Sequence, residues 1–208
     1  MLPPRPFLYP ILDLGLLGTR RPGAVASTLL DGGVTLLQLR GKTASDRELV
    51  VAAREVLAVT RPRGAYLVIN DRPDVAMVVG ADGVHVGQDD LRPRDVRALV
   101  GSRLIVGVST HDLAQVTAAA GEPVDYVALG PVFETRTKAR PDPVVGLDLL
   151  AQARLLARRP LVAIGGIDVA NARAVVQAGA DGLAVVSALL GARDLARALG
   201  DLDLELRR

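Results

Sequence analysis

The chain has 208 residues, 50% of them hydrophobic, which is enough for one compact domain with a sizeable core. It has no cysteine, so disulfides, a thiolate nucleophile and cysteine-ligated zinc or iron–sulfur centres are excluded. The formal net charge is only +2, the basic residues are scattered among acidic ones, and no tryptophan is available for stacking on bases, so we do not expect nucleic acid as a partner.

A membrane partner is not expected either. No apolar stretch approaches the roughly 18 residues of a membrane-spanning helix. The N-terminal residues have neither a long apolar run nor a small-residue cleavage site. We therefore expect a soluble, cytoplasmic protein.

Short apolar segments alternate with segments of helical spacing, and this cycle occurs eight times along the chain. The predicted strands are 7–13, 34–40, 65–71, 83–87, 104–110, 126–130, 161–165 and 182–187. The predicted helices are 23–31, 45–60, 73–79, 93–100, 112–120, 146–157, 169–178 and 188–199. Several strands are apolar without alternation, which is typical of parallel strands covered on both faces.

This order predicts an α/β protein with one domain over residues 1–208, a (β/α)8 TIM barrel. An open doubly wound sheet is the alternative, because the fourth and sixth strands are short. Local signals agree with the helices: Ser45 and Glu48 have the spacing of a capping box, and Asp112 can cap the fifth helix. In such barrels the active site lies at the C-terminal ends of the strands, so those ends are the places to search.

The second predicted strand ends in a basic cluster. Alternation puts Gln38 and Arg40 on one face, toward the mouth of the barrel, and Lys42 follows directly. An amide, a guanidinium and an ammonium in one place suit a polyanion such as a diphosphate. The alternative is that Arg40 belongs to a structural ion pair.

Carboxylates and an amide follow the third and fourth predicted strands. Asn70 and Asp71 end the third strand, and Asp89 and Asp90 follow the fourth. Beside the basic cluster, these groups are typical of a Mg²⁺ site that keeps waters and shares phosphate oxygens with a substrate. We expect Asp71 as one ligand and Asp90, or Asp89, as the second; a surface Asp–Arg pair is the alternative for the NDR motif.

The fifth predicted strand ends with Ser109, close in sequence to His111. The sequence has no G-x-S-x-G turn and supplies no third member of a catalytic triad, so we expect Ser109 to bind a ligand and not to attack one. His85 alternates with Val84 and Val86, so a packed or supporting role is as reasonable for it as catalysis.

All but two of the 25 basic residues are arginine, and the exceptions are Lys42 and Lys138. Because arginine supplies generic positive charge in this chain, each lysine is expected where a compact ammonium is needed. Lys138 ends a T-x-T-K motif with Thr135 and Thr137, in a polar segment after the sixth predicted strand. We predict that this loop binds a phosphate; a merely polar surface loop is the alternative.

The last two predicted strands end in small residues. Gly165 and Gly166 follow the seventh strand, and Ser187 ends the eighth. In barrels of this kind, the loops after these strands commonly bind phosphate through backbone amides. We therefore predict a second anion site, made mostly of backbone.

These segments occur in the order QLRGK, NDR, GVHVGQDDL, GVSTH, DYVALGPVFETRTK, VAIGGI and AVVSAL. In this order, over almost the whole chain, they resemble the thiamine phosphate synthase family. The resemblance implies a TIM-barrel transferase of thiamine biosynthesis with a Mg²⁺ cofactor. Its reaction would join 4-amino-2-methyl-5-pyrimidinylmethyl diphosphate to thiazole phosphate, giving thiamine phosphate and diphosphate.

The resemblance also implies a role for each matched residue. The pyrimidine diphosphate would be held by Gln38, Arg40, Lys42 and Asn70, and Mg²⁺ by Asp71 and Asp90. The leaving diphosphate would be contacted by Ser109 and Lys138. The thiazole phosphate would be bound by Thr135, Thr137, Gly166, Val186 and Ser187. The residues implied to act in catalysis are Arg40, Lys42, Ser109 and Lys138.

The chain departs from the family pattern after the T-x-T-K motif, where Arg140 replaces the usual acidic residue and Asp142 follows two positions later. Two other functions stay open: a thiazole tautomerase-like enzyme, which would transfer a proton, and a non-catalytic barrel that binds phosphate ligands. Apolar residues on the predicted helices would also permit a homodimer.

Overall fold

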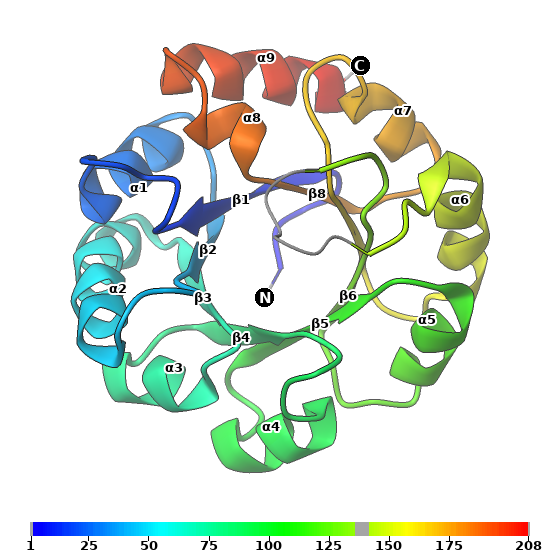
Figure 1. The fold of residues 1–208 in the computed structure, drawn as a ribbon, viewed down its shortest axis with the longest axis horizontal. Coiled ribbons are helices and arrows are strands. Elements are labelled where there is room, and N and C mark those ends of the chain that lie inside the picture. The colour runs from blue at the N-terminus through cyan, green and yellow to red at the C-terminus, as the bar shows by residue number, and fades with distance from the viewer. Residues whose placement is uncertain (1, 136–141, 208) are drawn as a thin grey trace.

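The computed structural model of the protein describes residues 2–135 and 142–207. Eight parallel strands close into a barrel in chain order, β1 to β8, and helices surround it (Figure 1). The strands are β1 Phe7–Asp13, β2 Leu36–Arg40, β3 Tyr66–Asn70, β4 Gly83–Val86, β5 Ile105–Thr110, β6 Tyr126–Leu129, β7 Leu161–Ile164 and β8 Gly182–Val185. The helices are α1 Pro22–Asp31, α2 Asp46–Thr60, α3 Pro73–Val79, α4 Pro93–Val100, α5 Leu113–Ala119, α6 Gly146–Leu156, α7 Ala172–Gln177, α8 Ser187–Leu190 and α9 Leu195–Arg207, with a 3₁₀ turn at Arg61–Arg63. The predicted (β/α)8 barrel is confirmed.

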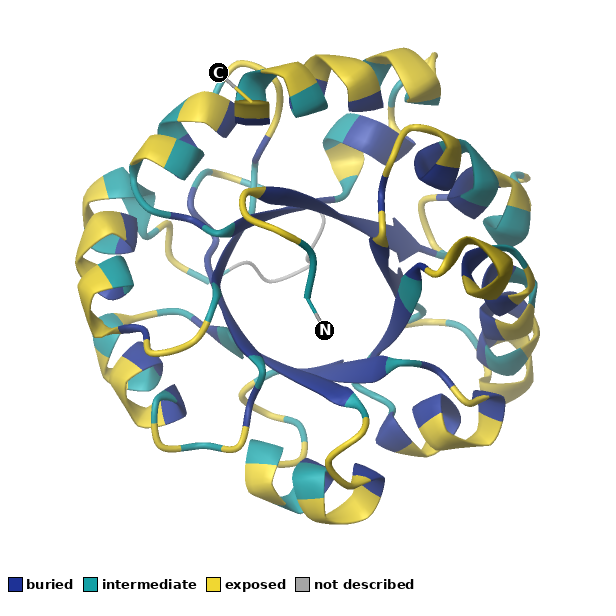
Figure 2. Ribbon diagram, turned by 180° about the vertical axis from the view of Figure 1, so that it is seen from behind, coloured by how far each residue is buried: buried dark blue, intermediate teal, exposed yellow. Residues whose placement is uncertain are grey.

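Alternation along the strands divides the core into two layers. On β1, Tyr9 and Ile11 belong to the apolar cluster inside the barrel, whereas Leu8 and Leu12 belong to the cluster between strands and helices. Figure 2 shows the strands buried along almost their whole length and the helices buried mainly on the side that faces the barrel. The strands therefore hold their side chains between two packed layers, which fixes the direction of each side chain at a strand end.

The sequence signals for two helix starts are confirmed. Ser45 Oγ accepts the N–H of Glu48 at 3.3 Å, while Glu48 Oε2 accepts the N–H of Ser45 at 2.8 Å, which completes the capping box before α2. Asp112 Oδ1 accepts the N–H of Gln115 at 2.7 Å and so caps α5.

The largest correction concerns the predicted helix 188–199, which is two helices, α8 and α9. Gly191 ends α8, and a Cβ at this position would lie 2.8 Å from the carbonyl oxygen of Ser187. Asp194 then starts α9, because its Oδ1 accepts the N–H of Arg197 at 3.0 Å. The apolar period continues across this break, which is why the prediction joined the two segments.

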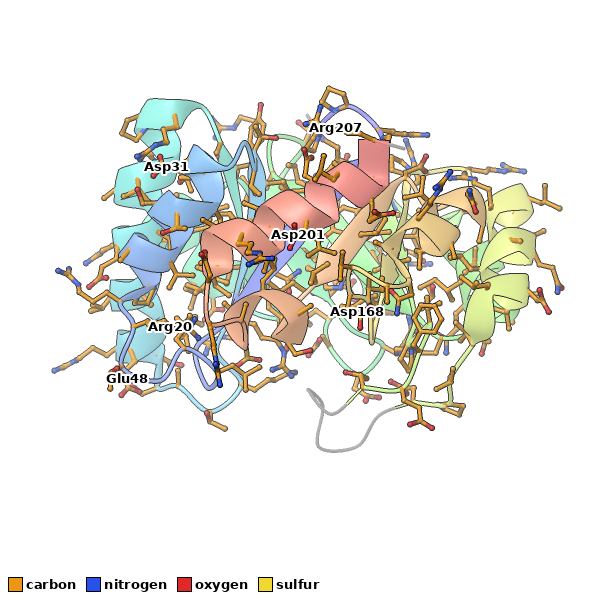
Figure 3. All side chains as sticks on the ribbon, turned by 90° about the horizontal axis from the view of Figure 1, so that it is seen from above. Arg20, Asp31, Glu48, Asp168, Asp201 and Arg207 are labelled. Atoms are coloured by element: carbon orange, nitrogen blue, oxygen red, sulfur yellow. The ribbon has the colours of Figure 1, made fainter. Side chains whose placement is uncertain are left out.

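The loops that follow the strands gather at one end of the barrel. Figure 3 shows Arg20, Glu48 and Asp168 near that end, and Asp31 and Arg207 near the opposite end. Arg20 holds the loop after β1 by donating to the carbonyl oxygens of Leu17 at 3.0 Å and Leu190 at 2.6 Å. This end of the barrel carries the candidate site.

At the opposite end, Asp82, Asp125 and Asp181 repeat one arrangement. Each precedes an even-numbered strand and accepts, at 2.8 Å, a backbone N–H from the preceding odd-numbered strand: those of Leu67, Val106 and Leu161. Asp181 also pairs with Arg154 at 2.5 Å and with Arg5 at 2.9 Å. It thereby ties α6 and the N-terminal segment, which crosses this end of the barrel (Figure 2), to the sheet.

We predict that Asp181→Ala lowers the free energy of unfolding by about 1–3 kcal/mol, because it removes the carboxylate that accepts the Leu161 N–H and pairs with Arg5 and Arg154. Asp201→Ala is the matched control, since Asp201 is half-exposed on α9 (Figure 3) and pairs with Arg197 only at 3.8 Å. It should change the free energy by less than about 0.5 kcal/mol. Urea unfolding measures both, and equal losses would contradict the assigned role of Asp181.

Candidate active site

A cavity of about 430 Å³ opens where the strands end, and every strand or the loop after it contributes to its wall. All predicted site residues that the structure describes line it: Gln38, Arg40, Lys42, Asn70, Asp71, Asp90, Ser109, Thr135, Gly166, Val186 and Ser187. Thr137 and Lys138 lie outside the described residues. The structure thus brings the predicted residues together, and their individual roles stay predictions.

Asp71 and Asp90 form the acidic side of the cavity. Asp71 has a left-handed backbone with φ of 62°, which is uncommon for a residue with a side chain, and its N–H donates to the His85 carbonyl oxygen at 2.7 Å. Asp90 Oδ2 accepts the N–H of Gly87 at 2.7 Å. Burial raises the pKa of Asp90, and a hydrogen bond with Asp71 raises it further. Backbone contacts therefore hold two carboxylates at a distance where they repel each other when both are ionised.

This carboxylate pair fits a divalent cation. A cation between Asp71 and Asp90 would favour the ionised form of Asp90, which is opposite to the effect that burial and Asp71 have on the pKa of Asp90. Across residues 2–135 and 142–207, no group of three or more His, Cys, Asp or Glu side chains is placed to hold a metal by itself. A cation on this pair would need further oxygens from water and ligand, and that is how Mg²⁺ is usually held.

Positive charge reaches the same cavity from Lys42 and Arg40, and each is already paired. Lys42 Nζ forms an ion pair with Asp71, and the Arg40 guanidinium forms one with Asp13. Asp13, which the sequence analysis missed, is the register partner of Arg40 between β1 and β2, and it also accepts the N–H of Gly15 at 2.9 Å. A guanidinium has five N–H donors, so this ion pair leaves Arg40 able to contact a phosphate as well.

A chain of hydrogen bonds crosses the floor of the cavity. Gln38 Nε2 donates to Tyr9 Oη at 3.0 Å, and Tyr9 Oη lies 2.8 Å from Tyr126 Oη. Tyr126 Oη lies 2.8 Å from His85 Nδ1, and His85 Nε2 lies 2.8 Å from Ser109 Oγ. The supporting role considered for His85 is thus the one that its contacts favour, whereas Tyr9 and Tyr126 were missed. Period-two alternation along β1 and β6 marks both tyrosines as inward-facing, but it says nothing about what they touch.

Both tyrosines on the cavity floor, Tyr9 and Tyr126, are neutral hydroxyls. Burial raises the pKa of Tyr9 and that of Tyr126 well above the ordinary value, because a phenolate would lose its hydration inside the barrel. The floor of the cavity is therefore polar but carries no fixed charge on these side chains.

Gly165 and Gly166 seat the loop that follows β6. Both have left-handed backbones, with φ of 99° and 65°. A Cβ on Gly165 would lie 2.5 Å from Pro131 Cα, and one on Gly166 would lie 2.5 Å from the Glu134 carbonyl oxygen. The glycine pair thus permits the close approach of the loop, which brings Thr135 to the cavity wall.

His111 joins the two described ends of the connection between β6 and α6. Its Nδ1 lies 2.6 Å from the carbonyl oxygen of Gly130, which can only accept, so Nδ1 is the donor. Its Nε2 lies 3.4 Å from Asp142 Oδ2. His111 is close to Ser109 in sequence, but in the structure its ring contacts Gly130 and Asp142, in the connection between β6 and α6.

Comparison with known proteins shows the family of this chain. A family model described as thiamine monophosphate synthase matches residues 8–189. The chain belongs to the thiamine monophosphate synthase family. A thiamine-phosphate synthase of Koribacter versatilis is 48% identical over 189 residues, which are 89% of each chain. One of Chloroflexus aurantiacus is 45% identical over 195 residues, 94% of this chain and 90% of that one.

Solved structures agree with the family. A thiamine phosphate pyrophosphorylase from Pyrococcus furiosus superposes with a TM-score of 0.86 at 35% identity, covering 96% of this chain and 95% of that chain. A 3-hexulose-6-phosphate synthase, at 20% identity and a TM-score of 0.67, shares the fold alone. The predicted family and its transferase class are therefore confirmed. Within the part of the chain that the structure describes, no helix is long and apolar enough to cross a membrane.

For this family member we predict that Asp90→Asn raises the urea midpoint of unfolding at pH 7 in metal-free buffer. The ionised carboxylate is disfavoured in the folded state, so its neutral isostere removes a cost while keeping an oxygen for the Gly87 N–H. The gain should vanish as the pH falls below about 4, where the carboxyl group of the unfolded chain is protonated too. Asp201→Asn is the exposed control and should give no gain; a loss of stability in Asp90→Asn at pH 7 would contradict the prediction.

Proposed function

We propose that the protein joins 4-amino-2-methyl-5-pyrimidinylmethyl diphosphate to thiazole phosphate, with Mg²⁺ as cofactor, and releases diphosphate. One observation carries this proposal: in a member of this family, Asp71, Asp90, Lys42 and Arg40 line the same cavity. Alternating positive and acidic groups suit a diphosphate that arrives with a divalent cation.

In the proposed reaction, the bond between the methylene carbon and a diphosphate oxygen breaks, and its electron pair leaves with the diphosphate. The thiazole nitrogen supplies the electron pair of the new bond to that carbon. An amino-substituted pyrimidine stabilises a cation-like methylene, so the protein has to neutralise the leaving group and exclude water. When bound, Mg²⁺ supplies positive charge to the diphosphate oxygens.

The chain's own residues divide this work. Arg40 at the end of β2 and Lys42 in the loop after it would donate to the diphosphate, and Ser109 would donate from β5. The family resemblance adds Lys138 as a second ammonium at the leaving group. Neither a nucleophile nor a strong base is needed, which agrees with a cavity whose Ser109 contacts a histidine that is itself held by Tyr126.

The thiazole phosphate would bind on the other side of the cavity, beside Gly166, Val186 and Ser187. Thr135 lines the same cavity from the loop after β6, and the resemblance assigns Thr137 to the same phosphate. Hydroxyls and backbone N–H groups suit a phosphate that is held without being transferred.

We expect purified protein to release diphosphate and thiamine phosphate in a one-to-one ratio when both substrates and MgCl₂ are present. A chelator should abolish release, because Asp71 and Asp90 would then hold no cation and the charge of the leaving diphosphate would be less well neutralised. The assay follows both products with time. Binding of the thiazole phosphate without diphosphate release would overturn the proposal in favour of a binding protein or a tautomerase.

Lys138→Ala should lower kcat by roughly a hundredfold to a thousandfold, because charge on the leaving group is stabilised mainly in the transition state. The KM for thiazole phosphate should stay nearly unchanged. Arg136→Ala is the matched control, since it removes a basic residue of the same segment to which no ligand is assigned. Equal loss of kcat and of thiazole phosphate affinity in Lys138→Ala would move Lys138 away from the leaving group.

A further inference from the structure

The hydrogen-bond chain on the cavity floor links two predicted ligand contacts that lie on different strands. It starts at Gln38 on β2 and ends at Ser109 on β5, passing through Tyr9, Tyr126 and His85. Four of these five side chains line the cavity, and Tyr126 lies fully buried beneath it. A ligand that touches both ends is therefore connected through three residues that the proposed function does not yet use.

Packing fixes the side chains in the middle of the hydrogen-bond chain, Tyr9, Tyr126 and His85. Tyr126 is the register partner of Gly107, and a Cβ on Gly107 would lie only 2.1 Å from Tyr126 Cζ, so the glycine makes room for the phenol ring. The His85 ring stacks on Tyr126 with centroids 5.4 Å apart and 21° between planes. Tyr9 meets Tyr126 edge-on at 5.7 Å. These contacts leave the hydroxyl groups little freedom to choose other partners.

The hydrogen bond from Gln38 to Tyr9 sets the donor–acceptor direction of the hydrogen-bond chain. The amide nitrogen of Gln38 can only donate, so Tyr9 Oη accepts from it. One arrangement then gives both phenol protons an acceptor among these five side chains: Tyr9 donates to Tyr126, and Tyr126 donates to His85 Nδ1. His85 consequently carries its proton on Nε2 and donates it to Ser109 Oγ.

We propose that Tyr9, Tyr126 and His85 are positioning residues whose hydrogen-bond direction sets what the two ends of the chain offer to the substrate. Because the amide nitrogen of Gln38 is committed to Tyr9, its Oε1 is presented as an acceptor. Because Ser109 Oγ accepts from His85, its own proton is directed to the ligand as a donor.

This inference rests on the proposed function and adds the specificity of the pyrimidine site. An acceptor at Gln38 suits the amino group of the aminopyrimidine, and a donor at Ser109 suits a diphosphate oxygen, which can only accept. An oxo group in place of the amino group would face the Gln38 acceptor and be rejected. If every hydrogen bond ran in the opposite direction, Ser109 would present a lone pair to the diphosphate. The same direction therefore suits both the amino group at Gln38 and the diphosphate at Ser109.

The first test is the tautomer of His85, read from long-range proton–nitrogen NMR spectra of protein with isotope-labelled histidine. The protein has only two histidines, so the signal that the His111→Asn variant loses belongs to His111 and the one that remains belongs to His85. We expect neutral His85 with its proton on Nε2. A proton on Nδ1, or an averaged mixture of tautomers, would overturn the proposal.

The second test compares Tyr126→Phe with Tyr66→Phe, the same change in a tyrosine at the start of β3, at the far end of the barrel. Tyr126→Phe should mix the His85 tautomers and lower kcat by roughly tenfold to a hundredfold. It should also narrow, by a similar factor, the preference for the aminopyrimidine diphosphate over its 4-oxo analogue, with the KM for thiazole phosphate unchanged. Tyr66→Phe should leave all of these as in the native protein.

A third comparison separates positioning from packing. His85→Gln keeps a side-chain N–H donor for Ser109, whereas His85→Leu keeps the bulk without a donor. His85→Gln should recover part of the activity that His85→Leu loses, and part of the preference for the aminopyrimidine diphosphate over its 4-oxo analogue. Equal activity of the two variants would overturn the proposal. Failure of the proposed function would look different, because the native protein would then release no diphosphate while NMR still reported the His85 tautomer.

Discussion

Closure of a parallel sheet is the constraint on which the site depends. When eight parallel strands form a barrel, their carboxyl ends meet at one rim, and alternation sends every second side chain inward. Residues as distant in sequence as Gln38 and Ser187 then line a single cavity. Helix packing on the outside holds the strands, so the inward residues keep their positions without support from the ligand.

The same constraint explains what could be predicted from sequence. Strand ends such as Gln38–Lys42 and Asn70–Asp71 are visible as polar residues that close apolar runs, and the barrel requires them to converge. The Arg40–Asp13 ion pair was left open, because it depends on the register of β1 against β2. A one-residue slip would turn Asp13 to the other face, and apolar periodicity alone does not fix that register.

The cavity floor was harder to predict for the same reason. Tyr9 and Tyr126 belong to β1 and β6, which are not neighbours in the barrel, so their contact follows from barrel diameter and from the space above Gly107. The break between α8 and α9 is a different kind of error. Gly191 and Asp194 are ordinary stop and start signals, and they were outweighed by a helical apolar period that runs through them.

Charge is distributed unevenly in the cavity, and desolvation accounts for it. The ionic groups, Asp71, Asp90, Lys42 and Arg40, lie at the rim, where water or phosphate can solvate them. At the rim the cost of holding Asp71 and Asp90 together is also visible, in a left-handed backbone at Asp71 and a raised pKa at Asp90. Backbone strain and charge repulsion of this kind are expected at residues that are kept for ligand binding and not for the stability of the fold.

The interior below the rim carries polarity in another form. An ionised side chain there would lose its hydration, whereas a chain of neutral groups can give its donors acceptors without carrying charge. Such a chain has a property that an ion pair lacks: its dipoles point one way, so a change at one end alters what the other end offers. Under the proposed function, these neutral hydrogen bonds would distinguish an amino group from an oxo group deep in the barrel, while the charged rim would bind the diphosphate without contacting the pyrimidine ring.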